Sequence, residues 1–98
     1  MYKIIIFPKA LKDIKKAKAW YKKEAGEFLS LRFKACIKES IEKLKSDKIE
    51  YGKIDEGFNR VFVKKFPYCI YYRKNEKEIL IFAVYHNKQT RLGLQERI

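Results

Sequence analysis

The sequence is poor in the residues that bind metals or form covalent cross-links. It holds one histidine, His86, and two cysteines, Cys36 and Cys69, which lack the close spacing of metal ligands. We therefore expect no metal site, and no motif indicates another cofactor. In a reducing compartment we expect the cysteines to act as small core residues. The alternative, a disulfide, needs an oxidising compartment that no sequence signal indicates.

Long apolar runs are missing as well. No stretch approaches the roughly 18 consecutive apolar residues of a membrane span, and no basic start is followed by an apolar segment and a cleavage site. We therefore expect a cytoplasmic protein without a membrane partner. No repeat or low-complexity linker divides the 98 residues. Because a chain of this length encloses one core, we expect a single domain over residues 1–98.

Acidic residues are scarce: 12 Asp and Glu stand against 24 Lys and Arg, which leaves a net charge of +12. Such an excess favours a polyanionic partner. Charge alone does not distinguish RNA, DNA, an anionic membrane surface or an acidic protein. The chain is 47% apolar, with seven Phe and seven Tyr, so it has the material for a folded core and not the composition of a disordered segment.

The N-terminal half predicts a strand followed by a helical hairpin. Residues 2–7 are β-branched and aromatic, and Pro8 ends this strand. A first helix from Lys9 to about Gly26 and a second one ending near Leu44 follow from apolar residues at spacings of three and four. The expected apolar stripes are Ala10, Ile14, Ala17 and Tyr21, with Leu11 beside them, and then Leu29, Phe33, Cys36, Ile37, Ser40, Ile41 and Leu44. Residues 46–57 predict a loop.

Three β-rich runs follow, over residues 59–65, 66–74 and 78–85. Their short spacers predict an antiparallel meander, so the order strand, helix, helix, strand, strand, strand is α+β. Alternation places Tyr68 and Tyr72 on one face of the sheet and Tyr71 on the other. We expect the helices to cover one face and a partly exposed aromatic surface to form the other.

Several motifs in this order resemble those of the RelE/ParE family of small bacterial toxins, also called plasmid stabilisation proteins. They are Phe7-Pro8-Lys9-Ala10 with Asp13-Ile14, Trp20-Tyr21, Phe33, Arg60, Phe66-Pro67-Tyr68, Ile70-Tyr71-Tyr72-Arg73 and Ala83-Val84-Tyr85-His86. The resemblance covers nearly the whole chain. It implies a β-α-α-β-β-β fold with a basic C-terminal tail, and the toxin of a type II toxin-antitoxin system that a cognate antitoxin holds silent.

The resemblance implies two different mechanisms of growth inhibition. RelE-like members cut mRNA on the ribosome as mRNA interferases, whereas ParE-like members bind DNA gyrase without nuclease activity. Charge and His86 favour a metal-independent, RNA-binding endoribonuclease. The alternatives are gyrase inhibition and an inactive basic binding module, because Tyr68 stands where RelE-like nucleases place a strand arginine and the tail motif over residues 88–94 is reduced.

For mRNA cleavage, cations would neutralise the scissile phosphate and a histidine would pass a proton. The candidate catalytic residues are Tyr68, Arg73 and His86, and the candidate phosphate-binding residues are Arg60, Lys64, Lys65, Lys88, Arg91 and Arg97. A hydrogen-bonded structural role is the alternative for His86. The antitoxin is expected to bring an acidic, amphipathic, partly disordered segment to an exposed apolar groove on the toxin.

Overall fold

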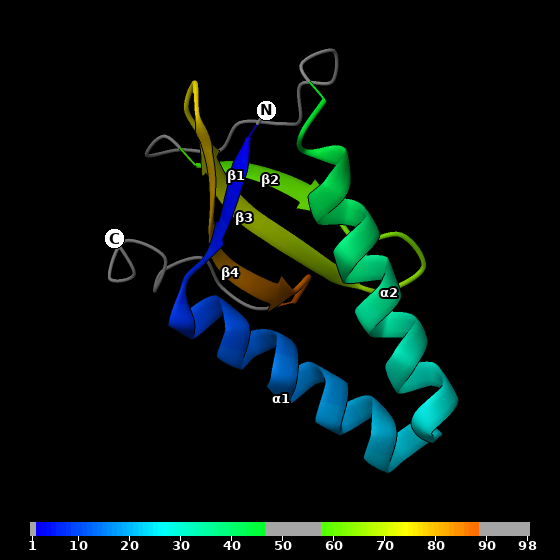
Figure 1. Cartoon of the computed structure of the whole chain (residues 1–98). Helices are drawn as coiled ribbons and strands as arrows, with labels where there is room; N and C mark the ends of the chain where they lie inside the picture. The colour runs from blue at the N-terminus through cyan, green and yellow to red at the C-terminus, as the bar shows by residue number, and fades with distance from the viewer. Residues whose placement is uncertain (1, 47–57, 89–98) are drawn as a thin grey trace.

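One sheet and two helices make up the part of the chain that the computed structural model describes, residues 2–46 and 58–88. In chain order these elements are β1 (Lys3–Ile6), α1 (Pro8–Ala25), α2 (Glu27–Lys43), β2 (Asn59–Phe62), β3 (Tyr68–Lys74) and β4 (Glu78–His86). The predicted α+β order is therefore confirmed (Figure 1). The basic tail and nearly all of the expected loop, residues 47–57, lie outside the described residues.

Gly26 joins the two helices into a hairpin. Its φ of 93° lies in the region that only glycine adopts without strain. The Gly26 N–H donates to the Lys22 carbonyl at the end of α1, and its own carbonyl accepts from Ser30 N–H at the start of α2. The Ser30 hydroxyl also donates to the Lys18 carbonyl at 3.1 Å. These bonds fix the angle at which α2 folds back along α1.

The sheet has the order β1-β4-β3-β2. β2, β3 and β4 form the predicted antiparallel meander, and β1 adds to β4 in parallel, with Lys3 opposite Glu78 and Ile6 opposite Ile81. A bulge interrupts β4, because Tyr71 faces Ala83 while Tyr72 faces Ile81. Phe82 is the additional residue, and it shares a face with Ala83.

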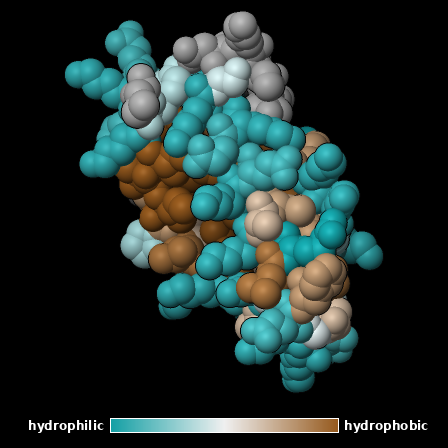
Figure 2. Space-filling model, turned by 45° about the vertical axis from the view of Figure 1, so that its right-hand side comes forward, coloured by the Kyte–Doolittle hydropathy of each residue, from teal (hydrophilic) through white to brown (hydrophobic). Residues whose placement is uncertain are grey.

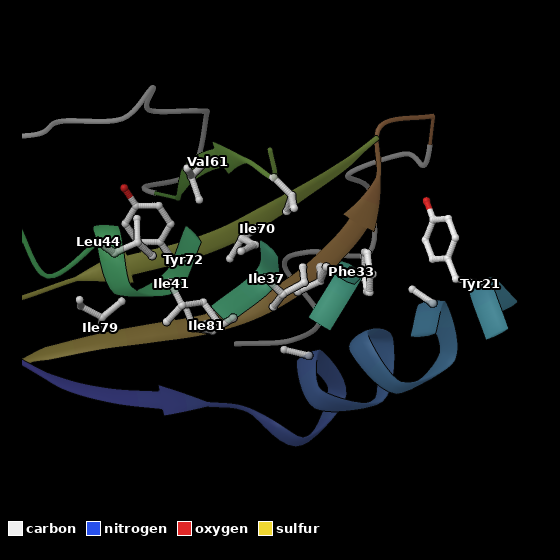
Figure 3. Close-up of a cluster of buried hydrophobic side chains, with 14 residues drawn as sticks. Tyr21, Phe33, Ile37, Ile41, Leu44, Val61, Ile70, Tyr72, Ile79 and Ile81 are labelled. Atoms are coloured by element: carbon white, nitrogen blue, oxygen red, sulfur yellow. The ribbon is translucent and has the colours of Figure 1, made fainter. Parts of the chain in front are cut away.

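The main core lies between the helices and one face of the sheet. In Figure 3 the labelled side chains of α2, including Phe33 and Ile37, face those of the strands. Its buried members are Ala10, Ala17, Tyr21, Phe33, Ile37, Ile41, Leu44, Val61, Val63, Ile70, Tyr72, Ile79, Ile81 and Val84. Most of both predicted stripes is thereby confirmed. Leu11, which lies beside the first stripe, is 42% exposed.

The opposite face of the sheet carries a second, aromatic cluster. It consists of Phe58, Cys69, Tyr71, Phe82, Ala83 and Tyr85. The alternation of Tyr71 against Tyr68 and Tyr72 is confirmed, but the expected partly exposed aromatic surface is not, since Tyr71 and Tyr85 are only 4% and 6% exposed. Phe62 at the sheet edge is the large apolar side chain that stands out from the described strands, at 59% exposed.

The two cysteines pack against different clusters. Cys69 belongs to the aromatic cluster, and Cys36 on α2 packs against the main core. Both are free thiols. Burial raises the pKa of the Cys69 thiol, which donates to the amide oxygen of Asn87 at 2.8 Å. The expectation that both act as core residues is confirmed for Cys69, and Cys36 is half-buried.

Candidate functional site

Several of the predicted site residues meet at one end of the sheet. Tyr68 opens β3 directly opposite His86, the last residue of β4. The Asn87 N–H then donates to the Pro67 carbonyl at 2.8 Å, which fastens the end of β4 to the turn between β2 and β3. Exposed lysines of that turn and of the β4 end, namely Lys64, Lys65 and Lys88, lie on the segments so joined. We call Lys64, Lys65, Tyr68, His86 and Lys88 the sheet-end group.

The His86 ring has a defined tautomer. Its Nδ1 accepts a hydrogen bond from the Lys88 backbone N–H at 3.1 Å. Because a backbone amide only donates, Nδ1 carries no proton in this arrangement and the neutral ring is protonated at Nε2. The ring lies edge-on to Tyr68, with the centroids 5.2 Å apart. The neutral ring can therefore donate a hydrogen bond from Nε2.

Tyr68 is held by aromatic packing between the sheet and the helices. Its ring lies 5.1 Å from that of Phe33 and 6.2 Å from that of Tyr21. Burial raises the pKa of Tyr68 above its ordinary value of 10.0, so the phenol stays protonated at neutral pH. It can donate a hydrogen bond there, but it cannot serve as a general base.

Neither arginine of the described strands joins this group. Arg73 lies five residues along β3 from Tyr68, about 16 Å at the usual rise of a strand, and on the opposite face. Its guanidinium stacks over the rings of Phe58 and Phe82, at 4.3 and 5.7 Å from their centroids. Arg60 also lies on that face, 4.9 Å over Phe62. Odd spacing in a strand separates Arg73 from Tyr68.

The remaining expectations about this site concern the tail and metals. Arg91 and Arg97 lie outside the described residues. Among residues 2–46 and 58–88, no three His, Cys, Asp or Glu side chains gather in a way that would hold a metal ion. The sheet-end group therefore offers cations, one imidazole and one phenol as its chemical groups.

Asp13 supports the strand that carries His86. Its Oδ2 accepts a hydrogen bond from the Val84 backbone N–H at 3.0 Å. β1 pairs with β4 only as far as Ile81, so the next part of that β4 edge faces α1 instead of a strand. The motif containing Asp13 was recognisable in the sequence, but this long-range contact was not.

A groove lies at the β1 edge of the sheet, on the side of the sheet that carries the helices. It is bounded by β1, α1 and α2. Its volume is about 490 Å³. Its apolar lining comes from all three elements: Ile4 and Ile6, Leu11 and Ile14, and Ile37 and Ile41. Along α2 the rim is charged, with Lys34, Lys38, Glu42 and Lys45. On the face shown in Figure 2, apolar surface is bordered by hydrophilic side chains.

The sequence predicted an exposed apolar groove without locating it. Leu11 carries the available signal, because it lies beside the stripe formed by Ala10, Ile14 and Ala17 rather than within it. Such a neighbouring leucine widens the apolar face of a helix beyond what one core covers. Ile4 and Ile6 gave no separate signal, since a strand of isoleucines is also typical of a fully buried position.

Neither described helix has the length and apolar character required to cross a bilayer.

No curated protein matches the chain. Among solved structures it is similar to one described as the chromosomal ParDE toxin-antitoxin system from P. aeruginosa, with a TM-score of 0.76 and 21% identity over 88% of this chain and 96% of that one. Residues 4–91 match the family model of the ParE toxin of the type II toxin-antitoxin system parDE. The chain therefore belongs to the ParE family of toxins, and its cognate partner is an antitoxin.

Proposed function

We propose that this toxin acts by binding DNA gyrase in the cytoplasm and not by cleaving mRNA. The observation that carries the proposal is the position of Arg73, which stacks on Phe58 and Phe82 across the sheet from Tyr68 and His86. A ribonuclease needs cations, an acid and a base around one phosphate. Here the two arginines of the described strands, Arg60 and Arg73, lie on the other face, and Tyr68 is a protonated phenol. Membership of the ParE family supports the same mechanism.

mRNA cleavage is the second candidate, and the sheet-end group is the observation that favours it. Lysines precede Tyr68 in the turn and follow His86 in the chain, and the Asn87–Pro67 hydrogen bond holds these two segments together. In this mechanism His86 would donate a hydrogen bond from Nε2 while the lysines contact phosphate. The mechanism then depends on His86 and is independent of Arg73.

The experiment that separates the two mechanisms uses toxin released from its antitoxin complex. Supercoiling by purified gyrase is measured with wild type, His86→Gln and Arg73→Gln, and RNA 5′ ends are mapped after a brief induction of the same three chains in cells. For gyrase binding we expect inhibited supercoiling, intact mRNA and retained inhibition in His86→Gln. Codon-spaced RNA ends that disappear in His86→Gln, with unimpaired supercoiling, would instead establish cleavage.

We infer further that the groove between β1, α1 and α2 receives the antitoxin. Six apolar side chains line it, and lysines outnumber glutamate along its α2 rim. Such a surface matches an amphipathic helix with an apolar stripe and acidic flanks. Burial of these apolar side chains would contribute to the affinity, and the lysines would favour acidic residues beside the apolar stripe.

A further inference from the structure

Among the strands that the structure describes, β2 is the outermost one at the end of the sheet opposite β1. Val63 directly follows β2 and lies opposite Tyr68, and its N–H donates to the Tyr68 carbonyl at 2.9 Å. In an antiparallel ladder, hydrogen-bonded pairs alternate with pairs whose backbone groups point away. Val61 is therefore bonded to β3, whereas the N–H and C=O groups of Arg60 and Phe62 point outward. This edge offers two donors and two acceptors.

The side chains of the same two residues stand together on one face. Arg60 faces Tyr71 and Phe62 faces Cys69 in the register, which places both on the side of the sheet away from the helices. The Arg60 guanidinium lies 4.9 Å over the Phe62 ring, and Phe62 is 59% exposed. The two outward-facing backbone positions thus carry one cation-aromatic pair between them.

The charged side chains of β2 and of the turn that follows it have one sign. From Phe58 to Tyr68 the sequence contains Arg60, Lys64 and Lys65 and no acidic residue. Lys64 and Lys65 are exposed in the turn that follows β2, and Lys65 adopts a φ of 68°, unusual for a residue with a side chain. A partner segment with Asp or Glu side chains would be attracted along the whole length of the strand.

We propose that gyrase contributes an extended acidic segment that adds to β2 as a further strand of the sheet. The inference rests on the proposed function and names the contact surface. Outward N–H and C=O groups at alternate residues are what an extended peptide pairs with. A nucleic acid would stack on Phe62 and contact cations, but its phosphates cannot donate to the outward carbonyls. β1 and its groove lie at the other edge, so the antitoxin site is left open.

Phe62→Pro and Phe62→Ala form a matched pair for the test. Both remove the ring, but only proline also removes the outward N–H, and an edge strand tolerates proline at such a position. Gyrase binding to immobilised toxin is measured for both variants and for wild type. We expect Phe62→Ala to weaken binding about fivefold and Phe62→Pro about tenfold more, the effect of one lost hydrogen bond together with a disturbed strand.

Hydrogen exchange provides an independent measurement on the wild-type chain. In the gyrase complex, the outward-facing amides of Arg60 and Phe62, within residues 59–63, should gain protection, whereas those lining the groove should not. This measurement decides the question even if Phe62→Pro fails to fold, which its thermal unfolding would reveal. Unchanged exchange over residues 59–63 would overturn the proposal.

The remaining outcomes separate this inference from the proposed function. If wild type fails to bind gyrase, both are overturned together. If wild type binds and Phe62→Pro matches Phe62→Ala, gyrase binding stands and the added strand is overturned. If a single-stranded oligonucleotide or the antitoxin protects residues 59–63 and gyrase does not, the edge belongs to that other partner and the proposal is wrong.

Discussion

The carboxylate of Asp13 accepts the Val84 backbone hydrogen bond that a neighbouring strand would otherwise accept. Its Oδ2 accepts the Val84 N–H at 3.0 Å across 71 positions of the sequence, at a point of β4 beyond its last pair with β1. Val84 is 2% exposed, so water is a poor substitute acceptor. α1 thus controls the position of the β4 end, two residues before His86.

Asp13→Ala should lower the free energy of unfolding by about 1–3 kcal/mol, because it leaves the buried Val84 N–H without this acceptor. Asp13→Asn keeps a carbonyl oxygen at the same place and should lose less. Urea unfolding of both variants measures the difference, and amide exchange at Val84 should accelerate in Asp13→Ala. Equal stability of the two variants would contradict this role.

Lys74 is expected to stabilise the end of α2. Its Nζ donates to the Leu44 carbonyl at 2.8 Å and to the Ser46 carbonyl at 3.1 Å, and lies 4.4 Å from the Tyr2 ring centroid. A cation at carbonyl groups left open by a helix is favourable. Lys74→Met should cost about 1–2 kcal/mol in urea unfolding. The control Lys77→Met, at an exposed position, should change stability little.

Stability should fall at alkaline pH partly through Tyr68. Burial raises its folded pKa above 10.0, so the unfolded chain releases the phenol proton first. The contribution of the protonated phenol to the free energy of unfolding is complete below pH 10.0, and it is lost as the pH rises through the folded pKa. Unfolding of wild type and Tyr68→Phe is compared from about pH 8 to about pH 11. The variant should lose less stability, and parallel curves would refute the effect.

The proposal that the groove binds the antitoxin can be tested with two variants, one that places a charge in the groove and one that places a charge outside it. Leu11 lines the groove and is 42% exposed, whereas Leu31 on α2 is 52% exposed and is not among the groove residues. Leu11→Asp should weaken antitoxin binding at least about tenfold, because a carboxylate meets apolar and acidic groups of the partner. Leu31→Asp should have a small effect. Calorimetric titration measures both, and equal losses would place the antitoxin elsewhere.

Periodicity predicted the elements well because each is decided by nearby residues. Pro8 marks the boundary between β1 and α1, and Gly26 the boundary between the helices, as expected. The strands 59–65 and 66–74 were predicted too long, since Val63 to Pro67 form a turn between β2 and β3. β-branched and aromatic residues in that turn pack against the core without belonging to a strand.

The site was harder to predict because its geometry depends on pairings between distant residues. Alternation along β3 already separates Tyr68 from Arg73, yet the expectation grouped them by closeness in sequence. The pairing of Tyr68 with His86 follows from the meander register, which a short turn at residues 75–77 makes accessible to sequence analysis. No short stretch of sequence indicates the parallel pairing of β1 with β4. The groove depends on that pairing, so it could not be located from the sequence either.

That parallel pair has a consequence for the order of events during synthesis. β1 is made well before β4, and the contact of Lys3 with Glu78 closes the long stretch of chain between them into a loop. Contacts of such sequence separation form late in folding. Ile4 and Ile6 reach their places in the groove only when β4 has been translated. If the groove receives the antitoxin, as proposed above, its binding surface is therefore complete only after β4 has been made, and a nascent chain without β4 lacks it.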